Sequence, residues 1–225
     1  VLRWRMPIDR VIKLVDSLQL DSENINTWKN GVERALKKYV TLNKLSHKGG
    51  VVLMGGSEDM QIPLCEVKDS FKIEDSIYNR SFESLSVLNA EKLYEECIAP
   101  LDPDTVILHI GDADTELFRN SQSEFLGKYV HLIAAIKAHN KKCRIAIVSI
   151  LNPSNSELIC KLNKQLKYIS DSEHCEFVDI STNSNWNPKT SMETTSFIYS
   201  MGFVRPLSVK RPVYNLVRAI YFAEA

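Results

Sequence analysis

The chain has 225 residues, of which 44% are hydrophobic and 25% charged, and its 28 Lys and Arg balance its 28 Asp and Glu. This composition is ordinary for a globular protein with a sizeable core. No apolar run is long enough to span a bilayer and no segment resembles a secretory signal, so we expect a cytoplasmic protein without a membrane span.

Charged residues are unevenly distributed. Residues 1–50 carry ten Lys and Arg against five Asp and Glu, residues 51–120 carry five against fifteen, and residues 201–225 carry four against one. The acidic block should repel polyanions, whereas the basic ends could bind RNA or another anion, or pair with the acidic block. The five cysteines are dispersed without a CxxC pair, which favours free thiols, and we expect no metal and no other cofactor.

Residues 1–48 predict an N-terminal helical extension. Apolar residues recur at helical spacing in two stripes: Ile8, Val11, Ile12, Val15 and Leu18 after Pro7, and then Trp28, Val32, Leu36 and Tyr39. Such stripes are typical of amphipathic helices. Two glycines, Gly49 and Gly50, then separate this extension from a domain that we place at residues 49–225.

The second segment alternates short apolar runs with helical patterns. Strands are predicted at residues 51–54, 105–110, 144–150 and 175–180, and residues 77–82 form a further strand or its exit loop. Helices are predicted at 85–99, 121–139 and 154–169, with a closing helix after Pro212. Capping boxes, Ser121 with Glu124 and Ser154 with Glu157, open two of these helices. Residues 61–76 carry weak signals, and we expect them to be irregular. The alternation predicts a three-layer α/β/α fold with a doubly wound parallel sheet of about five strands.

Ligands bind such sheets at the carboxyl ends of the strands, where Gly55-Gly-Ser57 follows the first strand. A serine at a strand-to-helix turn presents its hydroxyl beside backbone N–H groups, which are two parts that a nucleophilic hydrolase needs. The same pattern also describes a serine that caps a helix. Acidic residues follow both the first and third strands (Glu58, Asp59, Asp112, Asp114 and Glu116); they could hold a hard cation or form solvated loops.

Three segments in this order, Gly55-Gly-Ser57, Tyr78-Asn79-Arg80 and His109-Ile-Gly-Asp-Ala-Asp114, resemble blocks of the SGNH, or GDSL-type, hydrolase family. The resemblance covers about residues 50–225. It implies Ser57 as the nucleophile and a chiefly structural Asp114. The candidate binding residues are Gly55, Gly56, Asn79, Gly111, Asp112, Asp114 and Arg205, of which Arg205 could pair with Asp112 or Glu58.

Departures from the family pattern fall on the catalytic groups. Serines stand at Ser81–Ser84 where the family has an oxyanion-hole glycine, and Ala113 stands where it has an oxyanion-hole asparagine. In the closing block, Met201 and Val204 occupy the acid and base positions, with Arg205 alongside. We interpret His109 as a core residue, and His174 ends an Asp-x-x-His sequence that precedes the last strand, at the opposite end of the sheet from Ser57.

Three hypotheses follow. The first is an SGNH-like domain that has lost catalysis and binds a small ligand or a protein partner. The second is an atypical acyl-ester hydrolase that uses Ser57. The third is RNA or anion binding through the basic ends.

Overall fold

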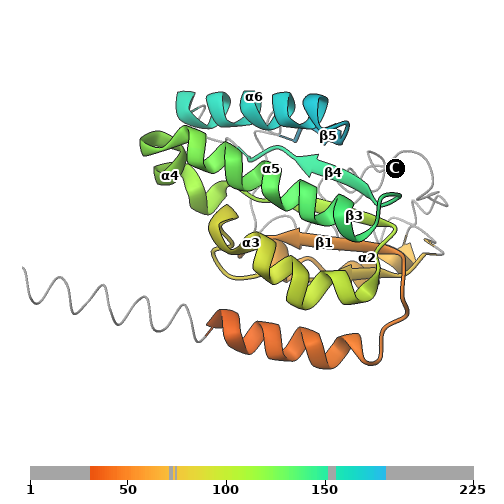
Figure 1. Cartoon of the computed structure of the whole chain (residues 1–225). Coiled ribbons are helices and arrows are strands. Elements are labelled where there is room, and N and C mark those ends of the chain that lie inside the picture. The colour runs from red at the N-terminus through yellow and green to blue at the C-terminus, as the bar shows by residue number, and fades with distance from the viewer. Residues whose placement is uncertain (1–30, 71–72, 74, 152–155, 181–225) are drawn as a thin grey trace, which may run out of the picture.

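The computed structural model describes residues 31–70, 73, 75–151 and 156–180. Its centre is a five-stranded parallel sheet in the order β2-β1-β3-β4-β5, which confirms the predicted fold class (Figure 1). The strands are β1 (Val51–Gly55), β2 (Ile77–Asn79), β3 (Thr105–His109), β4 (Arg144–Val148) and β5 (Glu176–Val178). Every pairing is parallel, so the carboxyl ends of all five strands meet at one edge of the sheet.

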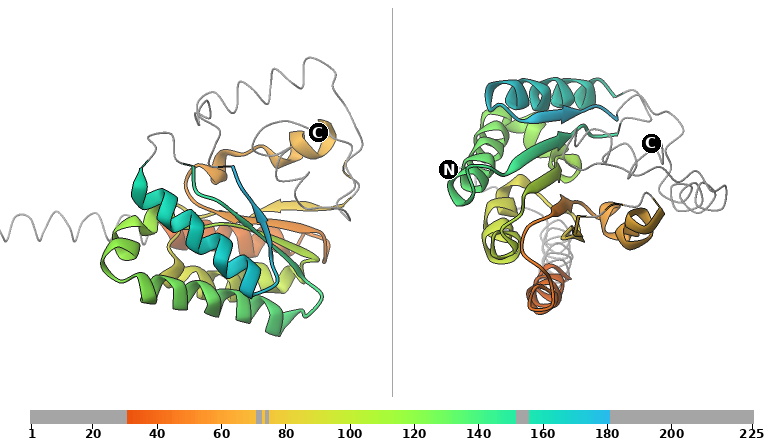
Figure 2. Two further views of the ribbon diagram at one scale, coloured as in Figure 1. Left: turned by 90° about the horizontal axis from the view of Figure 1, so that it is seen from above. Right: turned by 90° about the vertical axis from the view of Figure 1, so that its right-hand side faces the viewer.

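Helices cover both faces of this sheet. They are α2 (Leu64–Ser70), α3 (Val87–Leu93), α4 (Thr115–Asn120), α5 (Gln122–His139) and α6 (Glu157–Ser172), together with a helix over residues 31–43. Short 3-10 or π turns are η1 (Asp59–Gln61), η2 (Tyr94–Ile98), η3 (Ala99–Leu101) and η4 (Asp112–Asp114). Figure 2 shows α2 on one face and α3, α5 and α6 on the other. Within the described residues, no helix is both long and apolar enough to cross a membrane.

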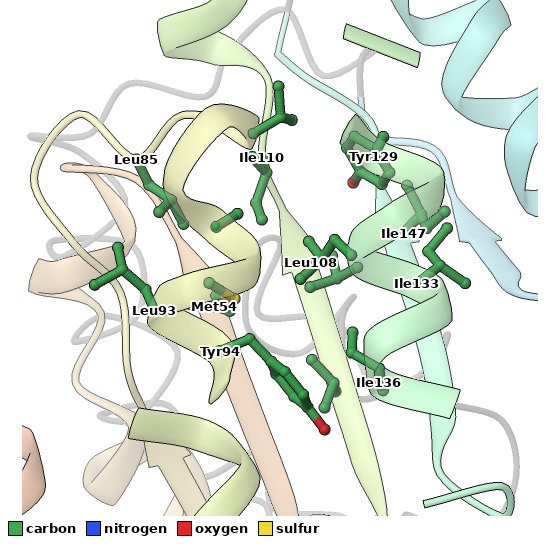
Figure 3. Packing of buried hydrophobic residues seen from close by; sticks show 14 of the residues in the cluster. Met54, Leu85, Leu93, Tyr94, Leu108, Ile110, Tyr129, Ile133, Ile136 and Ile147 are labelled. Carbon is green, nitrogen blue, oxygen red and sulfur yellow. The ribbon is translucent and has the colours of Figure 1, made fainter. Parts of the chain in front are cut away.

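Alternation along the buried strands divides the core in two. Val52 and Met54 of β1 belong to the larger cluster, under α3, α5 and α6, whereas Leu53 belongs to the smaller cluster under α2. Figure 3 shows Met54, Leu108 and Ile147 from three neighbouring strands facing the helices of the larger cluster. Because side chains alternate between the two faces of a strand, a continuous apolar run is what a sheet covered on both sides requires.

Two local expectations were wrong. Residues 61–76 were expected to be irregular, but they contain α2, which begins directly after Pro63 and buries Leu64 and Val67 against the sheet. A seven-residue helix with two buried positions has too short an apolar pattern to identify from sequence. Ser121 precedes α5 as predicted, but its side chain makes no capping hydrogen bond. The Ser154 capping prediction lies outside the described residues, and α6 has Ser156 at its N-cap.

The helix over residues 31–43 packs against the sheet domain. Tyr39 is buried in the larger cluster, with its ring against Phe82 at a centroid distance of 5.3 Å and its hydroxyl donating to the Ser81 carbonyl at 2.8 Å. The guanidinium of Arg80 lies over the rings of Tyr39 and Tyr78 at 5.2 and 5.3 Å. These contacts tie the helix to the loop that follows β2. The predicted helices over residues 7–20 and after Pro212 lie outside the described residues, and the division of the chain at residue 48 stays a prediction.

Candidate functional site

A cavity of about 120 Å³ opens at the carboxyl ends of β1 and β3. It is lined by Gly56, Ser57, Glu58, Asp59, Ser84, Leu85, His109, Gly111, Asp112 and Ala113. The position is the one expected for ligands in an open parallel sheet. All of these residues except Leu85 were singled out from the sequence, so the predicted site residues that follow β1 and β3 do meet there.

Ser57 lies exposed in the turn between β1 and η1. Its Oγ accepts a hydrogen bond from the backbone N–H of Ser84 at 2.9 Å, and it has no other hydrogen bond among the described residues. Ser84 has φ of 47°, in the left-handed region that favours glycine. A serine at this position therefore carries backbone strain, and its backbone N–H lies beside Ser57. Sequence reasoning missed this donor because it depends on backbone conformation.

Asp59 and His109 form a buried pair beside Ser57. The Nδ1 atom of His109 lies 2.9 and 3.0 Å from the two carboxylate oxygens of Asp59, and the two side chains are 7% and 3% exposed. Oδ2 of Asp59 also accepts the N–H of Gly56 at 2.8 Å. The Asn79 side chain donates to the Asp59 carbonyl at 2.6 Å, so Asn79 supports this turn from the end of β2 and does not line the cavity.

Gly55 makes the position of Asp59 sterically possible. A Cβ atom on Gly55 would lie 2.1 Å from Oδ2 and 2.5 Å from Cγ of Asp59. Gly55 is also the residue opposite His109 in the register of β1 and β3. The role of Gly55 is thus to admit the Asp59 carboxylate over the end of β1.

His109 was interpreted from the sequence as a core residue. It is buried, but it is the last residue of β3 and its side chain lines the cavity. Burial alone would lower the pKa of His109, whereas the Asp59 carboxylate, joined by Asp112 and Glu58, raises it above the ordinary value. The signal available in the sequence was its place directly before the Ile110-Gly111 turn, at a strand end and not mid-strand.

The cavity is strongly acidic. Desolvation raises the pKa of Glu58, and repulsion from Asp112 and Asp59 raises it further. Ala113 contributes no side-chain hydrogen-bond donor. An oxyanion hole needs donors aimed at developing negative charge, whereas Glu58, Asp59 and Asp112 line this cavity.

The other predicted acidic residues have structural partners. Asp114 accepts the hydroxyl of Ser86 at 2.5 Å and the N–H of Val87 at 3.1 Å, so it joins η4 to the start of α3. Glu116 is paired with Arg119. In the described part of the chain, no group of three or more His, Cys, Asp or Glu side chains is placed to hold a metal ion. The acidic residues that follow the first and third strands are therefore not arranged as one cation site within the described part of the chain.

All five histidines of the chain lie within the described residues: His47, His109, His131, His139 and His174. None of them is hydrogen-bonded to Ser57. His174 lies in the turn that precedes β5, at the amino end of the sheet, as predicted. Met201, Val204 and Arg205 lie outside the described residues.

Several solved structures share this architecture. A protein from Streptococcus pneumonia described as a platelet activating factor is 19% identical, with a TM-score of 0.62 over 74% of this chain and 81% of its own. A protein from Bacteroides fragilis described as an acylhydrolase is 18% identical, with a TM-score of 0.56 over 83% and 93%. A GDSL-like lipase from Bacteroides thetaiotaomicron is 19% identical, with a TM-score of 0.54 over 84% and 95%. The chain therefore has the SGNH/GDSL-type hydrolase fold.

Sequence comparisons add one local match. A family model described as the NrdJ homologue C-terminal domain matches residues 1–41. That match ends within the helix over residues 31–43, before the first strand of the sheet. No curated protein matches the chain in sequence.

Proposed function

We propose that this chain is a hydrolase-fold module that binds a small polar ligand in the cavity beside Ser57 and does not hydrolyse esters. The observation that carries the proposal is that, among the described residues, no histidine is hydrogen-bonded to the serine. Every histidine of the chain is in the described residues, and none is hydrogen-bonded to the Ser57 hydroxyl. A serine hydroxyl that is not hydrogen-bonded to a base is a weak nucleophile at neutral pH.

Two further features support the loss of acyl transfer. Ala113 cannot donate a side-chain hydrogen bond, and losing one such donor costs a hydrolase about 2.7–4 kcal/mol of barrier stabilisation. Carboxylates of Glu58, Asp59 and Asp112 line the cavity and would oppose a developing oxyanion. The same carboxylates, with the hydroxyl of Ser57, suit a neutral or cationic head group.

Hydrolysis is tested by incubating the full chain with p-nitrophenyl acetate and with a fluorophosphonate probe. Wild type, Ser57→Ala and Ser123→Ala are compared, since Ser123 is an exposed serine on α5 and serves as the matched control. We expect equal background turnover and no labelling in all three. Turnover or labelling that Ser57→Ala abolishes and Ser123→Ala retains would refute the loss of catalysis.

Binding is tested by backbone NMR with three small probes: acetamide, methylammonium and acetate. We expect the Gly56, Ser57 and Gly111 amide resonances to move with acetamide or methylammonium and not with acetate, because the lining carboxylates repel an anion. Ala113→Leu should fill the cavity and abolish those responses. No response to any of the three probes would contradict the ligand site.

Acyl-ester hydrolysis by Ser57 is the second candidate. The backbone N–H of Ser84, 2.9 Å from the Ser57 hydroxyl, is the observation that favours it. The fluorophosphonate experiment decides between the two. The RNA hypothesis depends on residues 1–50 and 201–225, most of which lie outside the described residues, and it is not developed further.

A further inference from the structure

The Asp59–His109 pair joins the Ser57 turn to the neighbouring strand. Asp59 belongs to η1, just after Ser57, and His109 ends β3. The Asp59 carboxylate holds the His109 ring and the Gly56 backbone at once, through contacts of 2.8 to 3.0 Å. Because Gly56 directly precedes Ser57, this carboxylate fixes the backbone from which the Ser57 side chain extends.

Both members of the pair are almost fully buried, and this makes their charges interdependent. An ionised carboxylate is stable in such a place only when it is hydrogen-bonded and compensated by an opposite charge. The protonated imidazole supplies that charge. After deprotonation, the Nδ1–H can still donate to Asp59, but the positive charge is gone.

We propose that His109 and Asp59 form a pH-dependent clasp on the Ser57 turn, tight when His109 is protonated and looser when it is neutral. The clasp would make ligand binding in the cavity depend on pH, and this effect on binding is the one part that rests on the proposed function. Among the described residues, the charged groups that face His109 are Asp59 and Glu58 from the turn after β1 and Asp112 from η4. Loss of the imidazolium removes a positive charge that all three of these carboxylates face.

The direction of the pH dependence follows from these partners. The pKa of His109 in the folded protein lies above the ordinary value of 6.5. The stability that the clasp supplies is therefore fully present below pH 6.5, the value expected for the unfolded chain, and is lost as the pH rises through the folded pKa. Each pH unit by which that pKa exceeds 6.5 corresponds to about a tenfold change in the folding equilibrium constant.

The test uses the full chain without ligand. Histidine side-chain ¹⁵N resonances followed against pH give the pKa of His109, and amide exchange of Gly56, corrected for intrinsic rates, reports the clasp between pH 5.5 and 8.5. We expect a pKa above 6.5 and a loss of Gly56 protection as the pH rises through it. That loss should be about tenfold for each pH unit by which the measured pKa exceeds 6.5. Asp59→Asn should lower the His109 pKa and remove the pH step.

Asp102→Asn is the matched control, because Asp102 lies 3.8 Å from the exposed His139 and should leave both readouts unchanged. If Asp59→Asn does not fold, His109→Gln provides the second variant, and its Gly56 protection should show no pH step. A wild-type His109 pKa at or below 6.5, or Gly56 protection that is independent of pH, would overturn the clasp. Either result leaves the ligand proposal standing, since no ligand is present, and failure of the three probes to bind leaves the clasp standing.

Discussion

Gly55 offers the sharpest test of how the site is built. A Cβ at this position would lie 2.1 Å from Oδ2 and 2.5 Å from Cγ of Asp59. That carboxylate cannot simply turn aside, because His109 and the Gly56 backbone hold it. Gly55→Ala should therefore displace Asp59 and break the buried pair, although the backbone of Gly55 has no positive φ that requires glycine.

Breaking a buried ion pair on one side costs about 3–5 kcal/mol. Alanine is favoured over glycine within a strand by about 0.5–1 kcal/mol, which offsets part of the loss. We expect Gly55→Ala to lower the free energy of unfolding by about 2–4 kcal/mol. The measurement is urea denaturation followed by far-ultraviolet circular dichroism.

Gly56→Ala is the matched control, because a Cβ on the adjacent glycine meets nothing within 4 Å. Its free energy of unfolding should change by less than about 1 kcal/mol. Removing the obstacle should also rescue the first variant: in an Asp59→Gly background, Gly55→Ala should be neutral or slightly stabilising. Equal destabilisation by Gly55→Ala and Gly56→Ala, or no rescue, would refute the steric argument.

Three other outcomes can be measured on the same protein. Arg80→Met should lower the free energy of unfolding by about 1–3 kcal/mol, because it removes two cation–π contacts and the hydrogen bonds of the guanidinium. Arg119→Met, which breaks an exposed ion pair, should lower it by less than about 0.5 kcal/mol. Ser84→Gly should raise the free energy of unfolding by up to about 1 kcal/mol, because glycine adopts the left-handed backbone of Ser84 without strain. A lower free energy of unfolding would show that the Ser84 backbone is not strained. Burial raises the pKa of the Cys97 thiol to about 12, so Cys97 should react with a thiol reagent only on unfolding, while the exposed Cys65 reacts at once; rapid modification of Cys97 in the native protein would show that the larger cluster opens.

The fold was predictable because its signal is repeated and local. Continuous apolar runs such as residues 105–110 identify strands covered on both faces, and the helical spacings between them fix a parallel sheet. The helix α2 escaped prediction because only two of its positions, Leu64 and Val67, are buried, and seven residues are too few for a clear period.

The site was predictable only in part. The strand-end rule placed Ser57 and Gly111 at one edge of the sheet. The pairing of Asp59 with His109 spans 50 residues and depends on the shape of the Gly55 turn, which no spacing in the sequence records. The hydrogen-bond donor at Ser84 is its backbone N–H, which a serine supplies as well as a glycine does. The absence of the family glycine from the sequence therefore did not mean that this donor was lost.

The stacked arrangement of Tyr39, Arg80 and Tyr78 bears on where the chain can be cut. A protein begun at residue 49 would lose the Tyr39 ring from Phe82 and one of the two aromatic faces of Arg80. The loop that carries Ser84 would then lose this support and keep its hydrogen bonds to Gly55 and Ser57 at the end of β1. We therefore expect the smallest autonomous folding unit to start at or before residue 31, and the helix that follows belongs mechanically to the sheet domain even though a separate family match ends inside it.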